Sequence, residues 1–304
     1  MGTSDPIPEI AAETSAGRAQ RAVTALLAAA GIDSPALDAR LLLQAATGRT
    51  REQLVIDPDF PLSQEQSATL SRFAARRLAR EPVSRILGER AFWGRNFEVT
   101  SDTLDPRQDT ETLVEFVLDL MCEEARTRGP LRVLDIGTGT GCILVTLLAE
   151  LPAARGTGVD LSTAALAVAA RNAARHRVGG RAAWWEVNVL DGVAGPFDII
   201  VSNPPYIPSA EILALEPEVR TFDPRLALDG GSDGLDYYRR IVAAVRKVTA
   251  PGGWCVVEVG AGQAAAVVEQ IEKQSGGAGV STIRTRADLG GHTRCVAWKP
   301  HSST

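Results

Sequence analysis

The sequence predicts an α/β fold with a mostly parallel sheet covered by helices on both faces, preceded by a separate bundle of helices. Short apolar runs alternate with helical patterns from Leu131 onward, which is the order of elements in parallel sheets. A glycine-rich stretch, DIGTGTG at residues 135–141, follows the first apolar run. The N-terminal part, up to residue 85, has apolar residues only at helical spacing. A chain of 304 residues is long enough for two such parts.

Helical segments come first along the chain. Apolar residues recur at helical spacing over residues 18–32 and 34–48, with a glycine stop in each, and TREQLVID and LSQEQSATLSRFAARRLAREP continue the pattern. Aromatic and β-branched residues around Gly94, Arg95 and Asn96 then predict a β-hairpin. We therefore expect a helical domain over residues 1–85 and a hairpin linker over residues 86–104.

Residues 105–304 predict the α/β domain itself. Strands are expected in LRVLDIG, ARGTGVDL, AAWWEVNV, FDIIVSN and WCVVEVG, with helices between them. The segments STIRTRADL and HTRCVAWK predict a terminal hairpin on the same sheet. Together these segments give a sheet of seven strands.

Composition and charge narrow the classes of function. The net charge of −5 lacks the basic footprint of general nucleic-acid binding, so we expect no direct nucleic-acid partner. No apolar run approaches the roughly 20 residues that cross a membrane, and the N-terminus lacks a signal-peptide pattern. The four cysteines form no CxxC pair, which predicts reduced thiols, no metal site and a soluble, cytoplasmic protein.

The glycine stretch has the spacing G-x-G-x-G rather than that of a phosphate-binding loop. Dinucleotide enzymes use G-x-G-x-x-G, but Cys142 occupies the third glycine position here, and no G-K-[ST] follows. Asp160 ends the next strand, where a carboxylate accepts both hydroxyl hydrogens of a ribose. A ribose, together with a small anion at the helix N-terminus, describes S-adenosylmethionine. The pattern is typical of class I methyltransferases; an ordinary glycine turn with a solvated aspartate is the alternative.

The stretch VSNPPYIP, Val201 to Pro208, predicts a ligand-binding corner. Pro204 and Pro205 cannot donate ladder hydrogen bonds, so the strand ends and leaves Asn203 at its carboxyl end, beside Gly137 of the first strand. The Asn203 side-chain oxygen and the Pro204 carbonyl can each accept one hydrogen of a planar NH₂ group, and Tyr206 offers a flat face. The corner resembles the [DNS]-P-P-[YFW] motif of methyltransferases that act on nitrogen conjugated to a π-system. A plain turn is the structural alternative.

A closer resemblance covers most of the chain. The segments REPVSRILGERAFWGRNFEVT, TLDPRQDTETLVE, VLDIGTGTG, IIVSNPPYIP, FDPRLALDGGSDGLDYYRRI and DLGGHTRCVAWK together resemble the PrmC/HemK family of protein-(glutamine-N5) methyltransferases. The resemblance implies a Rossmann-like class I catalytic domain over residues 105–304 that uses S-adenosylmethionine. It also implies that the N-terminal helical domain binds class 1 peptide chain release factors, whose Gly-Gly-Gln glutamine is methylated.

The same resemblance implies roles for individual residues. The cofactor-binding set is Gly137, Thr138, Gly139, Thr140, Gly141, Asp160 and Asn203, with Val189 near the adenine. The catalytic set is Asn203, Pro204 and Tyr206, and the substrate-binding set is the same three residues with Pro205. Asn188 replaces an acidic residue of the family. In LDPRQDTE, Asp105 and Gln108 also depart from the family pattern, whereas Arg107 and Glu111 match it and are expected at the mouth of the cofactor site. A helix N-terminus with an acidic first turn explains Asp109 and Glu111 equally well.

Two other functions remain open on the sequence alone. A methyltransferase acting on exocyclic amines of nucleic acid, such as DNA adenine or ribosomal RNA guanine, shares the corner motif but needs basic grooves that the charge does not supply. A non-catalytic adaptor would bind the release factor through its helices, and it would not need the glycine loop and the corner together.

Overall fold

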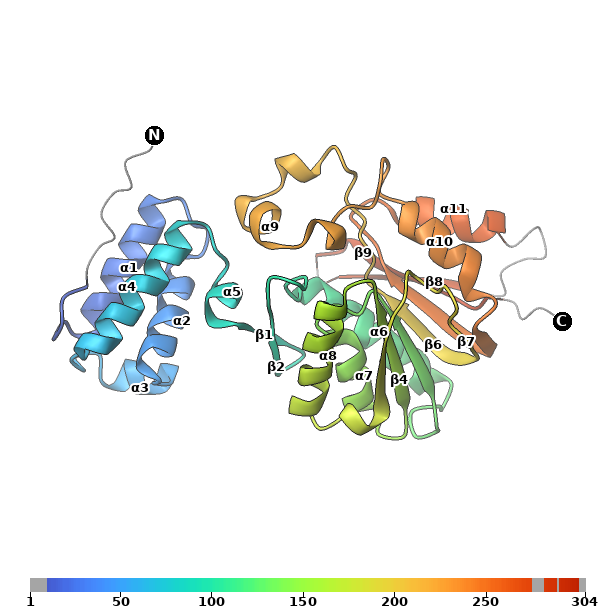
Figure 1. Cartoon of the computed structure of the whole chain (residues 1–304), viewed down its shortest axis with the longest axis horizontal. Helices are drawn as coiled ribbons and strands as arrows, with labels where there is room; N and C mark the ends of the chain where they lie inside the picture. Colours follow the sequence, from blue (N-terminus) through green and yellow to red (C-terminus); the bar gives the residue numbers. More distant parts are fainter. Residues whose placement is uncertain (1–9, 275–281, 289, 301–304) are drawn as a thin grey trace. The chain divides into compact units, whose positions relative to one another are not determined.

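The chain divides into two compact units, Met1–Gly88 and Glu89–Thr304. The computed structural model describes residues 10–274, 282–288 and 290–300 (Figure 1). The β-hairpin that the sequence predicts as a linker lies within the second unit, directly after the boundary at Gly88.

Over its described residues, 10–88, the first unit has five helices: α1 (Ala16–Ala29), α2 (Pro35–Thr47), α3 (Arg51–Ile56), α4 (Gln64–Leu78) and α5 (Val83–Leu87). Two of them begin with a capping box, in which Thr50 with Gln53 and Ser63 with Gln66 satisfy the free N–H groups of the first turn. The apolar stripes meet in a core that includes Leu27, fully buried. The predicted helical bundle is therefore observed.

The second unit begins with a hairpin of strands β1 (Glu89–Phe92) and β2 (Arg95–Glu98). Its two-residue turn is Trp93–Gly94, with φ angles of 51° and 66°. Such left-handed turn residues match the twist of a two-residue hairpin.

A seven-stranded sheet forms the centre of the second unit, in the order β5-β4-β3-β6-β7-β9-β8. The strands are β3 (Arg132–Ile136), β4 (Arg155–Asp160), β5 (Ala182–Glu186), β6 (Phe197–Ser202), β7 (Thr249–Glu258), β8 (Ile283–Ala287) and β9 (Thr293–Trp298). All pairs from β5 to β7 are parallel, and β9 pairs antiparallel with both β7 and β8. The predicted sheet and its terminal hairpin are confirmed. The strand order switches sides between the parallel neighbours β3 and β6, since β4 and β5 follow on one side of β3, and β6 and β7 on the other. Ligands bind at the carboxyl ends of the strands at such a switch point.

Helices cover both faces of this sheet (Figure 1). One apolar cluster contains α6 (Glu111–Glu123), α7 (Cys142–Glu150) and the end of α8 (Thr163–Arg175); the other contains α10 (Asp236–Val245) and α11 (Ala264–Gln274). Strand β6 joins the two clusters, because Ile199 and Val201 face the first while Ile200 faces the second.

The long connection from β6 to α10 carries only short helices: η3 (Ile212–Ala214), α9 (Pro217–Phe222) and η4 (Arg225–Ala227). Two further 3-10 turns are η1 (Gln108–Thr110), before α6, and η2 (Gly179–Arg181), before β5. Within the described ranges, no helix is long and apolar enough to cross a membrane.

Candidate functional site

Two cavities of the second unit meet at the carboxyl ends of the central strands. The glycine-loop cavity, about 300 Å³, is lined by Gly137, Gly139 and Asp160, among others. The tyrosine cavity, about 360 Å³, is lined by Tyr206, Glu258 and neighbouring residues. Both cavities are lined by the same four residues where they meet: Leu104, Asn203, Pro204 and Ala227. The corner that the sequence singles out is thus the boundary between two cavities.

The glycine loop has a backbone that only glycine adopts easily. Gly137, Gly139 and Gly141 have φ angles of 71°, 53° and 77°. The N–H groups of Gly137 and Thr138 donate to the Val159 carbonyl at 2.8 and 3.0 Å, which ties the loop to β4. A Cβ on Gly141 would stand 3.0 Å from that of Ala169 in α8, so the helix packs directly on the loop.

The two threonines of the loop point into the protein rather than into the cavity. The Thr138 hydroxyl donates to Asp135 at 2.7 Å, and the Thr140 hydroxyl accepts from the Cys142 N–H at 3.4 Å. Both threonines are buried, and neither lines the glycine-loop cavity. Burial raises the pKa of Asp135 to about 7, and the Thr138 hydrogen bond opposes that rise. These threonines therefore shape the loop through hydrogen bonds.

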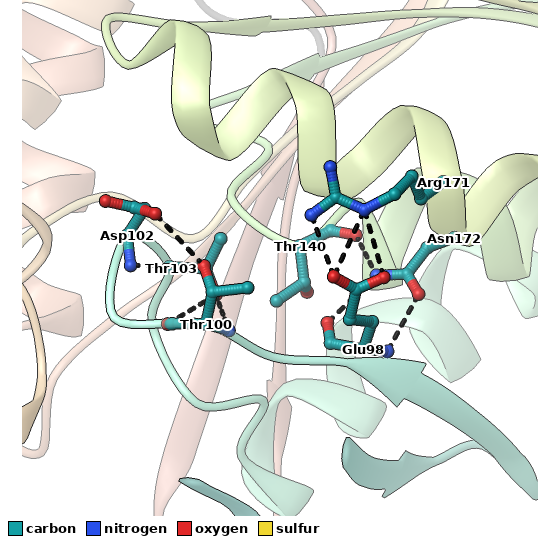
Figure 2. A network of polar contacts seen from close by, with 7 residues as sticks. All are labelled: Glu98, Thr100, Asp102, Thr103, Thr140, Arg171 and Asn172. Carbon is teal, nitrogen blue, oxygen red and sulfur yellow. Dashed lines mark hydrogen bonds and ion pairs between the residues drawn. The ribbon is translucent and has the colours of Figure 1, made fainter. Parts of the chain in front are cut away.

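Asn172 in α8 ties the loop to the hairpin (Figure 2). Its Nδ2 donates to the carbonyls of Thr140, at 2.9 Å, and Glu98, at 3.1 Å, while its Oδ1 accepts from the Glu98 N–H at 2.8 Å. The side chain is fully buried. The adjacent Arg171 forms an exposed ion pair with Glu98 at 2.7 Å. One amide thus connects the backbones of three segments beside the cavity.

Asp160 and Val189 also line the glycine-loop cavity. The Asp160 carboxylate accepts from the N–H groups of Gly139 and Ser162, at 2.9 and 3.0 Å, and each oxygen keeps a further lone pair. Val189 has a φ of 60°, a strained conformation for a β-branched residue that is typical of functional sites. The Asn188 side chain accepts from Arg240 at 2.7 Å.

The Asn203 side chain has a defined orientation at the corner. Its Nδ2 donates to the Thr110 hydroxyl at 3.1 Å, which leaves the carbonyl oxygen Oδ1 as the group available to a ligand. Tyr206 is held through its backbone carbonyl, which accepts from Gln263 Nε2 at 2.9 Å. Burial raises the pKa of the Tyr206 phenol to about 12, so the ring is neutral. Pro205 lines the glycine-loop cavity, whereas Tyr206 lines the tyrosine cavity.

Arg107 and Glu111, which the sequence analysis expects at the mouth of the cofactor site, each have a partner in another segment of the second unit. Arg107 lines the tyrosine cavity and pairs with Asp223 at 2.7 Å, and Asp223 also accepts from the Asp105 N–H at 3.3 Å. Glu111 lines neither cavity. Its carboxylate accepts from the Trp93 N–H at 2.7 Å and so holds the hairpin turn. The expected place of Glu111 at the mouth of the cofactor site stays a prediction.

Sequence reasoning missed two polar residues of the site, Thr110 and Glu258. Glu258 ends β7, is only 2% exposed and lines the tyrosine cavity. Burial raises its pKa to about 7. The sequence offered a signal for Glu258, because Glu258 ends a parallel strand just as Asp160 does, and that position is what indicates a functional role for Asp160. In the described part of the chain, no group of three or more metal-binding side chains is present.

The fold and site define the class of protein. The catalytic domain of hMettl16, solved with a 3′UTR hairpin, matches this chain with a TM-score of 0.52 and 16% sequence identity. The match covers 68% of this chain and 76% of that one. The fold is that of class I methyltransferases. The family models that match are the PrmC N-terminal domain, over residues 18–88, and the methyltransferase small domain, over residues 114–215.

Relatives of known assignment narrow the class to one family. The release factor glutamine methyltransferase of Rhodospirillum rubrum is 46% identical over 89% of this chain and 80% of its own length. That of Cereibacter sphaeroides is 47% identical over 93% of this chain and 97% of its own. The chain belongs to the release factor glutamine methyltransferase family.

Proposed function

We propose that this chain transfers the methyl group of S-adenosylmethionine to the side-chain amide nitrogen of the glutamine in the Gly-Gly-Gln motif of class 1 release factors. Family membership supports the reaction. The structural observation that carries the proposal is the sharing of Asn203 and Pro204 by two adjacent cavities. Such a boundary lets one pair of residues contact a methyl donor on one side and a methyl acceptor on the other.

The glycine-loop cavity fits S-adenosylmethionine in its donor set. The free lone pairs of the Asp160 carboxylate suit the two ribose hydroxyls, and the closely approaching glycines give a ligand access to the N-terminus of α7. Val189 and Leu161 offer apolar surface for the adenine. Of the loop residues expected to bind the cofactor, Gly137 and Gly139 line the cavity, whereas Thr138, Thr140 and Gly141 support the loop.

The tyrosine cavity is the proposed site of the glutamine side chain. Asn203 Oδ1 and the Pro204 carbonyl accept the two N–H bonds of the carboxamide, while the neutral ring of Tyr206 provides a flat apolar wall beside it. Pro205 stiffens the backbone between them. Two acceptors on a planar NH₂ group fix both its position and the direction of its lone pair.

The chain's contribution to the chemistry is orientation and electrostatics. A carboxamide nitrogen is a weak nucleophile, and acceptors on both N–H bonds raise its electron density. The bound sulfonium supplies an electrophilic methyl group, so in-line transfer needs chiefly a fixed approach. As the N–C bond forms, the S–C bond breaks with its electron pair left on sulfur, and one N–H proton of the glutamine passes to solvent water. Burial raises the pKa of the Cys142 thiol to about 12, which argues against a thiolate nucleophile near the loop.

The partner proposed for the first unit is the release factor itself. Residues 18–88 match the PrmC N-terminal domain, and the resemblance assigns that domain to release-factor binding. A release factor substrate would place the reaction in the cytoplasm, where translation ends.

The deciding experiment offers the purified protein S-adenosylmethionine carrying a labelled methyl group. Parallel reactions contain a release factor, the same factor with its Gly-Gly-Gln glutamine changed to alanine, DNA, or ribosomal RNA. We expect label only on the unaltered factor, with a mass increase of one methyl group on the peptide that holds the glutamine. Label on nucleic acid instead would replace the proposal with the exocyclic-amine alternative. A release factor that binds but never gains mass would indicate an adaptor.

A further inference from the structure

Glu258 is a buried acid that lines the tyrosine cavity but not the glycine-loop cavity. Ser202 of β6 pairs with Val257 of the parallel strand β7. The residues that follow, Asn203 and Glu258, therefore leave the sheet side by side. The Oε2 atom of Glu258 has no hydrogen-bond partner among the described residues. Burying an acid in this way costs free energy, and stability alone gives no reason for it. A ligand in the tyrosine cavity is the remaining candidate partner.

The other charged residues that line this cavity are less buried than Glu258. Arg107 and Asp109 each have an ion-pair partner, at 2.7 and 3.0 Å, and Arg90 is half-buried in β1. Glu258 forms no ion pair within the described part of the chain, so no neighbouring cation is bonded to its carboxyl group. A negative charge on Glu258 would therefore be available to whatever occupies the cavity.

The proposed methyl transfer moves a positive charge from one cavity to the other. The nitrogen lone pair of the glutamine forms the N–C bond, and the electron pair of the S–C bond stays on sulfur. The positive charge thus leaves the glycine-loop cavity and arrives on the glutamine nitrogen, where it stays until one N–H proton passes to water. Asn203 Oδ1 and the Pro204 carbonyl meet it with partial charges only. A full negative charge held in a buried wall of the cavity stabilises such a transition state more strongly.

We propose that Glu258 is a further catalytic residue, which contacts the glutamine side chain in the tyrosine cavity and, when ionised, stabilises the positive charge that arrives on the glutamine nitrogen. This role rests on the proposed function, because it requires a methyl acceptor at the corner. The amide is neutral before transfer, so the interaction favours the transition state over the bound substrate and acts on kcat more than on KM. A glutamate side chain in the same place would be repelled, because its carboxylate has the same sign.

This role makes the reaction depend on pH, because Glu258 has to be ionised during transfer. Burial is the largest influence on the pKa of Glu258 and raises it to about 7. Asp109 raises the pKa further, while Arg294 and Arg107 lower it. Activity should therefore be full above this pKa and fall as the pH drops through it.

The other titratable groups that interact electrostatically with Glu258 are two phenols and two thiols: Tyr206, Tyr238, Cys142 and Cys295. Burial raises the pKa of each of these four groups, so they remain neutral near pH 7. A change of activity in that range therefore reports on Glu258 rather than on these neighbours.

The test compares wild type with Glu258→Gln and Asp109→Asn by kcat and by KM for a release factor, from about pH 5.5 to pH 9. Glu258→Gln keeps the size of the side chain and removes the charge. Its kcat should fall at least about tenfold at pH 8, and the decline of activity below about pH 7 should disappear. Asp109→Asn is the matched control, because Asp109 lines the same cavity but is exposed and paired with Arg294 at 3.0 Å. Its kcat should stay within about threefold of wild type.

Stability separates this role from a structural one. Glu258→Gln should lose activity while its urea midpoint at pH 8 stays the same or rises, because the variant no longer buries a charge. A residue needed only for the fold would lose activity and stability together. A release factor with glutamate in place of the Gly-Gly-Gln glutamine gives a binding readout without turnover. It should bind Glu258→Gln at least about threefold more tightly than it binds wild type at pH 8.

Glu258→Gln with a kcat within about threefold of wild type at pH 8 would overturn the role of Glu258 and leave the proposed function intact. A parallel loss of activity and stability, or a decline at low pH that persists in the variant, would overturn it equally. If Glu258→Gln does not fold, the wild-type profile decides, and a kcat that does not change between about pH 5.5 and pH 9 would rule out the charge. A wild-type protein that never methylates a release factor would overturn both proposals.

Discussion

Replacement of Asn203 by alanine tests the chemistry most directly. The change removes one of the two proposed acceptors of the glutamine amide and one hydrogen bond, the 3.1 Å contact to Thr110. The Pro204 carbonyl remains, because it belongs to the backbone. We therefore expect partial positioning of the substrate with a poorly directed nitrogen.

The expected sizes of the effects on kcat and on cofactor affinity follow from the contacts that each cavity loses. An oriented group that acts on the reacting centre contributes roughly 10²–10³ in kcat, so Asn203→Ala should lower kcat by about that factor. The glycine-loop cavity keeps its glycines, Asp160 and Val189, so the dissociation constant for S-adenosylmethionine should change by less than about threefold. The lost contact to Thr110 should cost about 1 kcal/mol of unfolding free energy.

The assay is single-turnover methylation of a release factor, with cofactor affinity measured by calorimetry. Asn188→Ala is the matched control, because Asn188 lines only the glycine-loop cavity and its side chain is bonded to Arg240. Its kcat should stay near wild type. An Asn203→Ala protein that turned over at the wild-type rate would refute the placement of the glutamine amide at this corner, and a loss confined to cofactor affinity would refute it equally.

Three further predictions concern the supports of the site. Asp160→Ala should weaken S-adenosylmethionine binding by about 10–100-fold in calorimetry, since charge-assisted hydrogen bonds are lost, and unchanged affinity would exclude the ribose role. Asn172→Leu should lower the unfolding free energy in urea by about 2–4 kcal/mol, because the Glu98 N–H and the Thr140 carbonyl lose a buried partner; a loss below about 0.5 kcal/mol would contradict this. The pKa of Glu258 is raised from 4.5 to about 7, so the folded state keeps the proton to a higher pH than the unfolded state does. The contribution of protonated Glu258 to the free energy of unfolding is therefore present below pH 4.5 and is lost as the pH rises to about 7. Glu258→Gln should therefore gain stability relative to wild type above pH 7, on the order of 3 kcal/mol, and equal urea midpoints at pH 5 and pH 8 would disprove the shift.

The sheet was predictable because its signals are local. The central strands β3 and β6 are short apolar runs, and β3 is followed by Gly137 while β6 is followed by Asn203 and two prolines. The left-handed backbone at all three loop glycines is also a local property, because glycine adopts positive φ angles without the steric cost that other residues have. The direction of Thr138 and Thr140 did not follow. Their side chains satisfy Asp135 and the Cys142 N–H inside the loop, and a motif match does not say which way a side chain turns.

The side-chain partners of Glu111 and Arg107 could not be predicted from the sequence motif. Glu111 bonds to the hairpin turn at Trp93, and Arg107 to Asp223 in the connection after β6. Both side chains belong to one short motif, LDPRQDTE, and motif resemblance gave them one shared role. The two side chains have different roles because their partners, Trp93 and Asp223, lie in different segments of the chain. Only the folded structure brings those segments next to the motif.

The orientation of Asn203 also depends on a partner outside its motif, and this orientation matters for the chemistry. The motif NPPY predicts that an amide stands at the end of β6, but an amide has a donor end and an acceptor end. The Nδ2 group of Asn203 donates to the hydroxyl of Thr110, in the turn before α6, so the acceptor end is the one left for a ligand. A corner with the same NPPY motif but without a neighbouring hydroxyl would hold its asparagine in either orientation. Specificity for an NH₂ group therefore depends on Thr110 as well as on Asn203, and it should be lost when the Thr110 hydroxyl is removed even though the motif is intact.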